Sequence, residues 1–227
     1  MAAAMGGEGK ICIALGGRSR HHELEFDRPE RLPANCRSII EGWFRRAISK
    51  LHAPESECFE PFIFTWIAFN AWAEAVTGLE RETGDKGWVE TLSRDEFLFG
   101  KFANRIQNAD DDVTRAAQQF RRYWPIPKMQ DLRSKEGPSG WLEIDPHEER
   151  LRFFEKYSIC YEPRCAPQHV ASSIPLDWEH FIRATYRVRC NLFHGDKSLY
   201  HPDYQIIVAS AFRALAGFLD GLRIFAA

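Results

Sequence analysis

The sequence predicts an all-α protein, a helical bundle with a loop-rich insertion before its last two helices. Apolar residues recur at three- and four-residue spacing over most of the chain, which is the period of an amphipathic helix, and few stretches alternate with period two as strands do. The 227 residues are 44% hydrophobic and 13% aromatic, a composition that can bury a core. No internal repeat is found, so a single domain with embellishments is expected.

The first 34 residues are expected to form a flexible tail and lead-in, and residues 35–227 to form the helical domain. Residues 1 to about 20 are rich in Gly, Ala and Ser, with at most a short strand at KICIAL. Residues 21–34 are polar and contain two prolines, which is typical of an extended segment.

Two helices are expected at the start of the domain. Asn35 is predicted to cap the first, over CRSIIEGWFRRAISKL (36–51). The second is predicted to begin near Pro61 and to end at Gly78. It is apolar on nearly all sides, which is typical of a helix at the centre of its domain.

The middle of the chain predicts two or three shorter helices over residues 85–124, with Asp85 and Ser93 as candidate caps. Prolines and glycines are concentrated in residues 125–145, which predicts a loop or insertion. A short helix over HEERLRFFEKYSI (147–159) and a further loop (161–176) are expected after it.

The last two helices have clear local signals. Asp177 is expected to cap WEHFIRATYRVRCNLFHG (178–195), Gly195 is expected to end it, and Pro202 to open the final helix. On a wheel of about 100° per residue, Arg187, Asn191 and His194 share one face of the penultimate helix. Its core face is predicted to hold four other residues: Phe181, Thr185, Val188 and Leu192. The spacing alone also fits a plain amphipathic helix, and the helix dipole by itself favours a C-terminal histidine.

The residues of this motif resemble a known family signature. RCNLFHG is similar to that of the HEPN superfamily, in which an Arg is followed after four to six residues by a His on the penultimate helix of a small α-bundle. Arg189 and Arg187 both satisfy this spacing to His194. NLFHGDK looks most like the Apea-like branch. An aromatic early helix with an embedded Asn (WIAFNAW) and a long final helix extend the resemblance to roughly residues 35–225.

The resemblance implies an HEPN-like domain that forms a homodimer and brings two Arg/His motifs together. It implies a metal-independent endoribonuclease that needs no cofactor, acts on RNA as a toxin or antiviral defence effector, and is held in check by an antitoxin or regulatory protein. Arg189 and His194 would be catalytic, and three residues would contact the substrate: Arg187, Asn191 and Lys197.

A second possibility is a catalytically inactive dimeric HEPN module that binds a nucleotide, RNA or a protein partner, because some members of the superfamily have lost catalysis. The sequence departs from a common form of the motif at Cys190, where Asn or Asp often follows the Arg. A purely structural helical domain is the third reading.

The chemistry of metal-free RNA cleavage fits these residue types. The 2′-hydroxyl of the substrate attacks the phosphate, so the ends carry 2′,3′-cyclic phosphate and the site needs a proton acceptor, a proton donor and a cation. Histidine titrates near neutral pH and suits acid–base work. Arginine offers a planar fork that holds phosphate oxygens. One histidine can hardly serve as acid and base in one turnover, whereas a dimer supplies two.

Other functional classes receive little support. The net charge of −2 excludes a globally basic nucleic-acid-binding chain, so any RNA contact must be local. Six irregularly spaced cysteines and the absence of a signal or long apolar segment favour a reduced, cytoplasmic protein without a membrane partner. CYEPRC with His169 is a weak zinc pattern, so no metal site is expected. RRYWPIPK (121–128) fits either RNA stacking or a packed helix end.

Overall fold

The computed structural model describes residues 24, 26, 28–79, 83–108, 110–126, 129, 174–194 and 200–222. All regular structure in these ranges is helical, which confirms the predicted all-α class. The possible strand at KICIAL, the helix over 147–159, Gly195 and Lys197 lie outside the described residues. The elements are η1 (Arg28–Arg31), α1 (Ala34–Ile48), η2 (Glu55–Glu57), α2 (Phe59–Thr77), α3 (Gly84–Leu92), α4 (Glu96–Ile106), α5 (Asp112–Arg121), α8 (Trp178–Phe193) and α9 (Pro202–Gly221).

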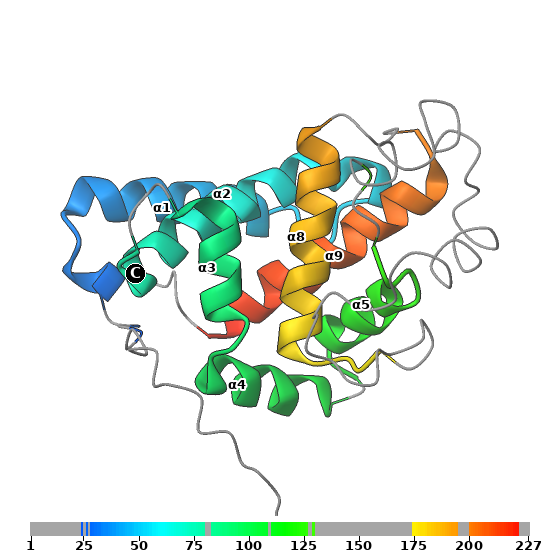
Figure 1. Ribbon diagram of the computed structural model, residues 1–227. Coiled ribbons are helices and arrows are strands. Elements are labelled where there is room, and N and C mark those ends of the chain that lie inside the picture. Colours follow the sequence, from blue (N-terminus) through cyan, green and yellow to red (C-terminus); the bar gives the residue numbers. More distant parts are fainter. Residues whose placement is uncertain are drawn as a thin grey trace, which may run out of the picture.

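The core lies between α2 and α9, which contact each other and most of their neighbours. α1 packs along α2, and α5 packs along α9, whereas α8 crosses α9 with α3 and α4 on one side and α5 on the other (Figure 1). The helix α2 buries residues on nearly all its faces, including Trp66 and Trp72, and therefore occupies the central place predicted for it. It ends at Gly78, whose φ of 61° is a left-handed conformation that glycine adopts at little cost.

An aromatic cluster joins α4, α8 and α9. The ring of Phe102 lies 4.9 Å from Phe181, 5.8 Å from Trp178 and 5.3 Å from Phe218, measured between centroids. These side chains are almost wholly buried. The indole Nε1 of Trp178 also donates a hydrogen bond to the backbone oxygen of Leu92 at 2.8 Å, which ties the end of α3 to the start of α8. The first half of α8 is therefore fixed by packing from three sides.

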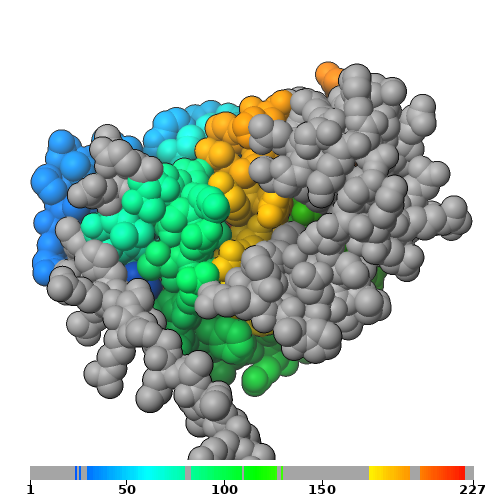
Figure 2. All heavy atoms as spheres, viewed as in Figure 1, coloured from blue at the N-terminus to red at the C-terminus, as the bar shows by residue number. Residues whose placement is uncertain are grey.

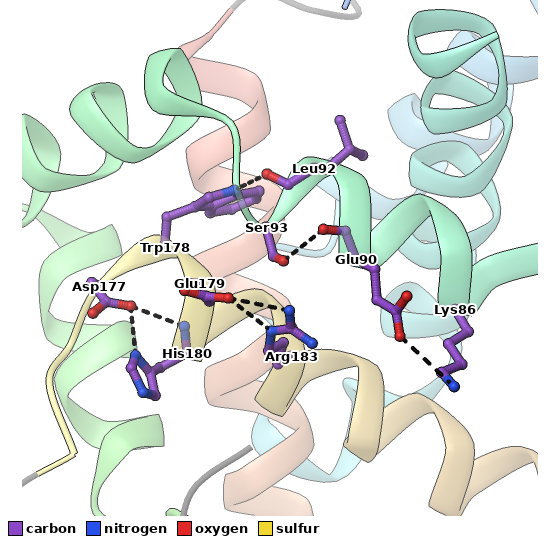
Figure 3. Close-up of polar contacts among 9 residues, drawn as sticks. All are labelled: Lys86, Glu90, Leu92, Ser93, Asp177, Trp178, Glu179, His180 and Arg183. Atoms are coloured by element: carbon purple, nitrogen blue, oxygen red, sulfur yellow. Dashed lines mark hydrogen bonds and ion pairs between the residues drawn. The ribbon is translucent and has the colours of Figure 1, made fainter. Parts of the chain in front are cut away.

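The start of α8 is capped as the sequence predicts. The Oδ1 atom of Asp177 accepts a hydrogen bond from the backbone N–H of His180 at 2.9 Å and lies 2.8 Å from Nδ1 of the same residue (Figure 3). Glu179 and Arg183 form an ion pair one turn apart at 3.1 Å. Pro202 opens α9, also as predicted, after His201 as the cap. The local signals at both helix starts are thus sufficient to position them.

Three residues predicted as caps do not begin a helix. Asn35 already lies in the first turn of α1, Asp85 is the second residue of α3, and Ser93 follows the end of α3. The cap of α4 is instead Asp95, which has extended backbone angles and accepts a hydrogen bond from the N–H of Leu98 at 2.8 Å. A residue that caps a helix through its side chain typically has such non-helical angles, and those depend on the chain that precedes it. Burial raises the pKa of Asp95 above the ordinary aspartate value.

The end of the predicted N-terminal lead-in packs on the domain. Leu24, Phe26 and Leu32 contact the core, and the ring of Phe26 lies 4.9 Å from that of Phe97 on α4. The boundary at residue 34 stays a prediction. In the part of the chain that the structure describes, every helix is too short or too polar to cross a membrane.

Candidate functional site at the end of α8

Four of the five predicted site residues lie at the end of α8, whose surface runs beside that of α3 (Figure 2): Arg187, Arg189, Asn191 and the C-cap residue His194. The backbone N–H of His194, the C-cap residue, donates to the oxygen of Cys190 at 3.1 Å, and its imidazole is exposed. Arg187 is partly exposed on the same side of the helix wheel. Neither side chain makes a hydrogen bond or ion pair with another described residue. Among the described residues, no partner therefore competes with a ligand for either side chain.

Arg189 differs from Arg187 because its side chain is held inside the domain. Its Nη2 atom lies 2.7 Å from Oδ2 of Asp85 on α3, and its side chain is 24% exposed. The guanidinium carbon also lies 4.4 Å from the centre of the Phe193 ring, a cation–π contact. The same Asp85 oxygen accepts a hydrogen bond from Nε1 of Trp66 at 3.2 Å. One carboxylate oxygen thus joins α2, α3 and α8, and it orients the arginine.

Tyr186 and Cys190 form the inner side of this cluster. The ring of Tyr186 stacks on Trp66 with centroids 6.0 Å apart. Burial raises the pKa of the Tyr186 hydroxyl, and the neighbouring Cys190 and Asp85 act in the same direction, whereas Arg189 opposes them. The phenol is therefore neutral and is a poor candidate for a general base. Cys190 is buried with a free thiol, as is usual for a cysteine that packs in a core.

Asn191 does not lie on the exposed surface with His194. Its side chain is among the buried polar groups, at 2% exposure, and its Oδ1 accepts a hydrogen bond from the backbone N–H of Met129 at 3.2 Å. This bond attaches the chain that follows α5 to α8. A direct contact between Asn191 and a substrate would require the chain at Met129 to move, so its predicted role as a substrate contact stays a prediction. Lys197 lies outside the described residues.

The second basic and aromatic stretch, RRYWPIPK, is used for packing where it is described. Tyr123 and Trp124 are buried. Nε of Arg121 donates to the backbone oxygen of Ile174 at 2.8 Å. These rings cannot stack on bases without leaving the core, which agrees with the packed-helix reading of this segment.

Metal-binding groups are not clustered in the described ranges: no three His, Cys, Asp or Glu side chains are placed to hold one ion. Cys36, Cys58 and Cys190 are free thiols. The CYEPRC segment and His169 fall outside these ranges.

Sequence reasoning missed Asp85, Trp66 and Phe193 as members of this site. Asp85 was interpreted as a helix cap, and nothing local links it to an arginine about a hundred residues later. A charged residue on the inner side of a short helix beside a tryptophan-rich helix is the only signal that could have suggested a buried partner. Comparison of the chain with protein-family models, with curated proteins and with solved structures found no match.

Proposed function

We propose that the chain is a metal-independent endoribonuclease of the HEPN type, acting as a toxin or antiviral defence effector, with its active site at the end of α8. The observation that supports this most is the combination of an exposed imidazole at His194 with an oriented guanidinium at Arg189 on the final turns of one helix. A metal-independent ribonuclease needs both groups, and the exposed imidazole of His194 lies outside the core.

In the proposed reaction the 2′-hydroxyl of the substrate attacks the adjacent phosphorus. The 2′-oxygen–phosphorus bond forms, the bond to the 5′-oxygen breaks, and a 2′,3′-cyclic phosphate results. A base takes the proton of the 2′-hydroxyl while an acid gives a proton to the leaving 5′-oxygen. His194 takes one of these roles, and His194 of a second copy takes the other in a homodimer.

Arginine stabilises the charge that develops on the phosphate. Asp85 and Phe193 occupy one edge and one face of the Arg189 guanidinium, which has five N–H donors, so donors remain for a phosphate oxygen. Holding the group in this way reduces the entropy lost when the substrate binds. Arg187, which is aligned with His194 and unpaired among the described residues, would bind a neighbouring phosphate.

The alternative is a catalytically inactive dimeric module that binds a nucleotide, RNA or a protein partner. The specific observation in its favour is the ion pair of Arg189 with Asp85, because a carboxylate that neutralises the arginine weakens its attraction for phosphate. Cys190 also favours this alternative, because it is buried at a position where a polar residue is common in the family that the chain resembles.

The deciding experiment is incubation of the purified full chain with total RNA in excess chelator. Cleavage should persist and leave 2′,3′-cyclic phosphate ends. His194→Ala should lower the rate by roughly 10²–10⁴, the usual effect of losing a positioned acid–base group. Arg189→Ala should lower it comparably, and Arg187→Ala less. Arg45→Ala, at an exposed arginine of α1, is the matched control and should cleave normally.

Full activity of the His194→Ala protein, or complete dependence on added divalent metal, would contradict the nuclease mechanism and leave the binding module.

The homodimer is tested separately by sedimentation. We expect a dimer at tens of micromolar, with α8 at the interface. A monomer at that concentration would remove the second histidine and with it the two-histidine mechanism.

A further inference from the structure

A partly open cavity with a mixed apolar and polar lining lies between the α1–α2 connection, α5 and α9, and it shares no residue with the end of α8. Its volume is about 480 Å³, within the range of small-molecule sites. Apolar side chains and potential hydrogen-bonding groups line it together. Its charged or titratable lining residues are His52, Glu55, Asp112, Arg115 and Arg213.

Arg213 of α9 is the central feature of this cavity. Its Nη2 atom donates to the backbone oxygen of Ala53 at 2.6 Å and its Nε to that of Leu51 at 3.3 Å. It forms no ion pair with another described residue. Carbonyl oxygens orient a guanidinium but carry no net charge, and the two bonds use only part of its donors. A fixed, partly buried positive charge therefore remains at the cavity wall.

The nearest sulfur does not neutralise Arg213. The thiol of Cys58 is buried, and burial raises its pKa, with Arg213 acting in the opposite direction. The thiol therefore stays protonated at neutral pH. Among the described residues, Arg213 is thus bonded to two carbonyls beside a neutral thiol and has no carboxylate within ion-pair distance.

The other charges of the lining limit the ligand. Arg115 and Asp112 form an ion pair with each other, and Arg115 also donates to the backbone oxygen of Asp110 at 2.7 Å. His52 and Gln119 add potential donors, and Glu55 adds one negative charge. Glu55 opposes ligands with several negative charges, such as a triphosphate.

We infer that this cavity binds a small organic acid with one carboxylate or phosphate head group, whose oxygens receive hydrogen bonds from Arg213. The planar fork of arginine fits either head group. The apolar lining provided by Leu51, Val113 and Ala116 receives the rest of the molecule. The inference does not depend on the proposed nuclease activity.

The test is calorimetric titration of the full chain with two matched pairs of probes. Adenosine 5′-monophosphate with adenosine forms the phosphate arm, and N-acetyl-leucine with N-acetyl-leucinamide forms the carboxylate arm. At least one acid should bind with a dissociation constant below about 1 mM, and its neutral counterpart should bind at least tenfold more weakly. Arg213→Gln should weaken binding of the acid by about 10- to 100-fold, the usual effect of losing a charged hydrogen bond.

Two controls locate the site. Arg45→Gln, at an exposed arginine of α1, should leave the affinity unchanged. His194→Ala should also leave it unchanged, which separates this cavity from the end of α8. Because Arg213→Gln removes two bonds to the backbone and could unfold the chain, modification of the wild-type protein by phenylglyoxal gives a second measurement. The acid should protect Arg213, and not Arg45, in peptide mass maps.

The inference is overturned if neither acid binds better than its neutral counterpart. It is equally overturned if the folded Arg213→Gln protein binds as the wild type does, if the acid leaves the modification of Arg213 unchanged, or if binding is lost in His194→Ala instead.

Discussion

The contact between Asp85 and Arg189 predicts a large and specific loss of stability when the carboxylate is removed. The two side chains are 18% and 24% exposed, and Asp85 also accepts the hydrogen bond of Trp66. Breaking a fully buried ion pair costs about 3–5 kcal/mol, and an exposed pair contributes about 0–1 kcal/mol. This partly buried pair lies between these limits, so Asp85→Ala should lower the free energy of unfolding by about 2 kcal/mol.

The same helix offers a matched control. Lys86 and Glu90 of α3 form an ion pair one turn apart at 3.7 Å, and they are 76% and 42% exposed (Figure 3). Glu90→Ala should cost about 0.3–0.5 kcal/mol, the usual value for an exposed pair of this spacing. Both variants remove a carboxylate from α3, so the difference between them reports the buried contacts of Asp85 with Trp66 and Arg189 together.

The assay is urea unfolding of the wild type, Asp85→Ala, Arg189→Ala and the double variant. The double-mutant cycle should give a coupling free energy of about 1 kcal/mol or more between the two positions. Asp85→Asn should retain an acceptor for Trp66 but lose the charge that holds the guanidinium, so RNA cleavage should fall while Glu90→Ala cleaves normally. If Asp85→Ala costs no more than Glu90→Ala, or if the coupling is near zero, Asp85 does not position Arg189.

Two further predictions concern the scaffold. Phe102→Ala should lower the free energy of unfolding by about 3–5 kcal/mol in chemical denaturation, because its ring is buried among those of α8 and α9. Phe97 lies on the same helix and is 50% exposed, so Phe97→Ala should cost about 1 kcal/mol or less. Equal costs would show that the aromatic cluster is not the core. The pKa of Asp95 is raised by folding, so ionisation of this carboxyl destabilises the folded state, and that loss is relieved as pH falls through the folded pKa. Asp95→Asn keeps a capping acceptor, so in thermal unfolding it should be at least as stable as the wild type at pH 7. Any such advantage should disappear as pH falls. An advantage that grows in acid would contradict the direction of the pKa shift.

Much of the fold could be predicted because its signals are local. The position of α2 follows from its uninterrupted apolar sequence and from Gly78, and the starts of α8 and α9 follow from Asp177 and Pro202. The cap of α4 could not be predicted in the same way, since the choice between Ser93 and Asp95 depends on how the chain leaves α3.

The candidate site shows the same division between local and distant information. The exposure of His194 follows from its place at the end of a helix. The pairing of Arg189 with Asp85 and the burial of Asn191 against Met129 depend on which helices pack together. A helix wheel places Asn191 beside His194, but it contains no information on which other segment of the chain packs over that face of the helix. Tertiary contacts therefore decide which polar residues of the motif reach solvent.

Hydrogen bonds between residues far apart in the sequence have a consequence for synthesis of the chain. Trp178 donates to Leu92 across 86 residues, and Arg213 donates to Leu51 across 162 residues. A ribosome adds about 5–20 residues per second, so α2 waits on the order of ten seconds before α8 and α9 emerge to cover it. During that time Trp66 and Trp72, both buried in the finished fold, are exposed on a nascent helix. We therefore expect α2 to be the segment that holdase chaperones recognise during translation.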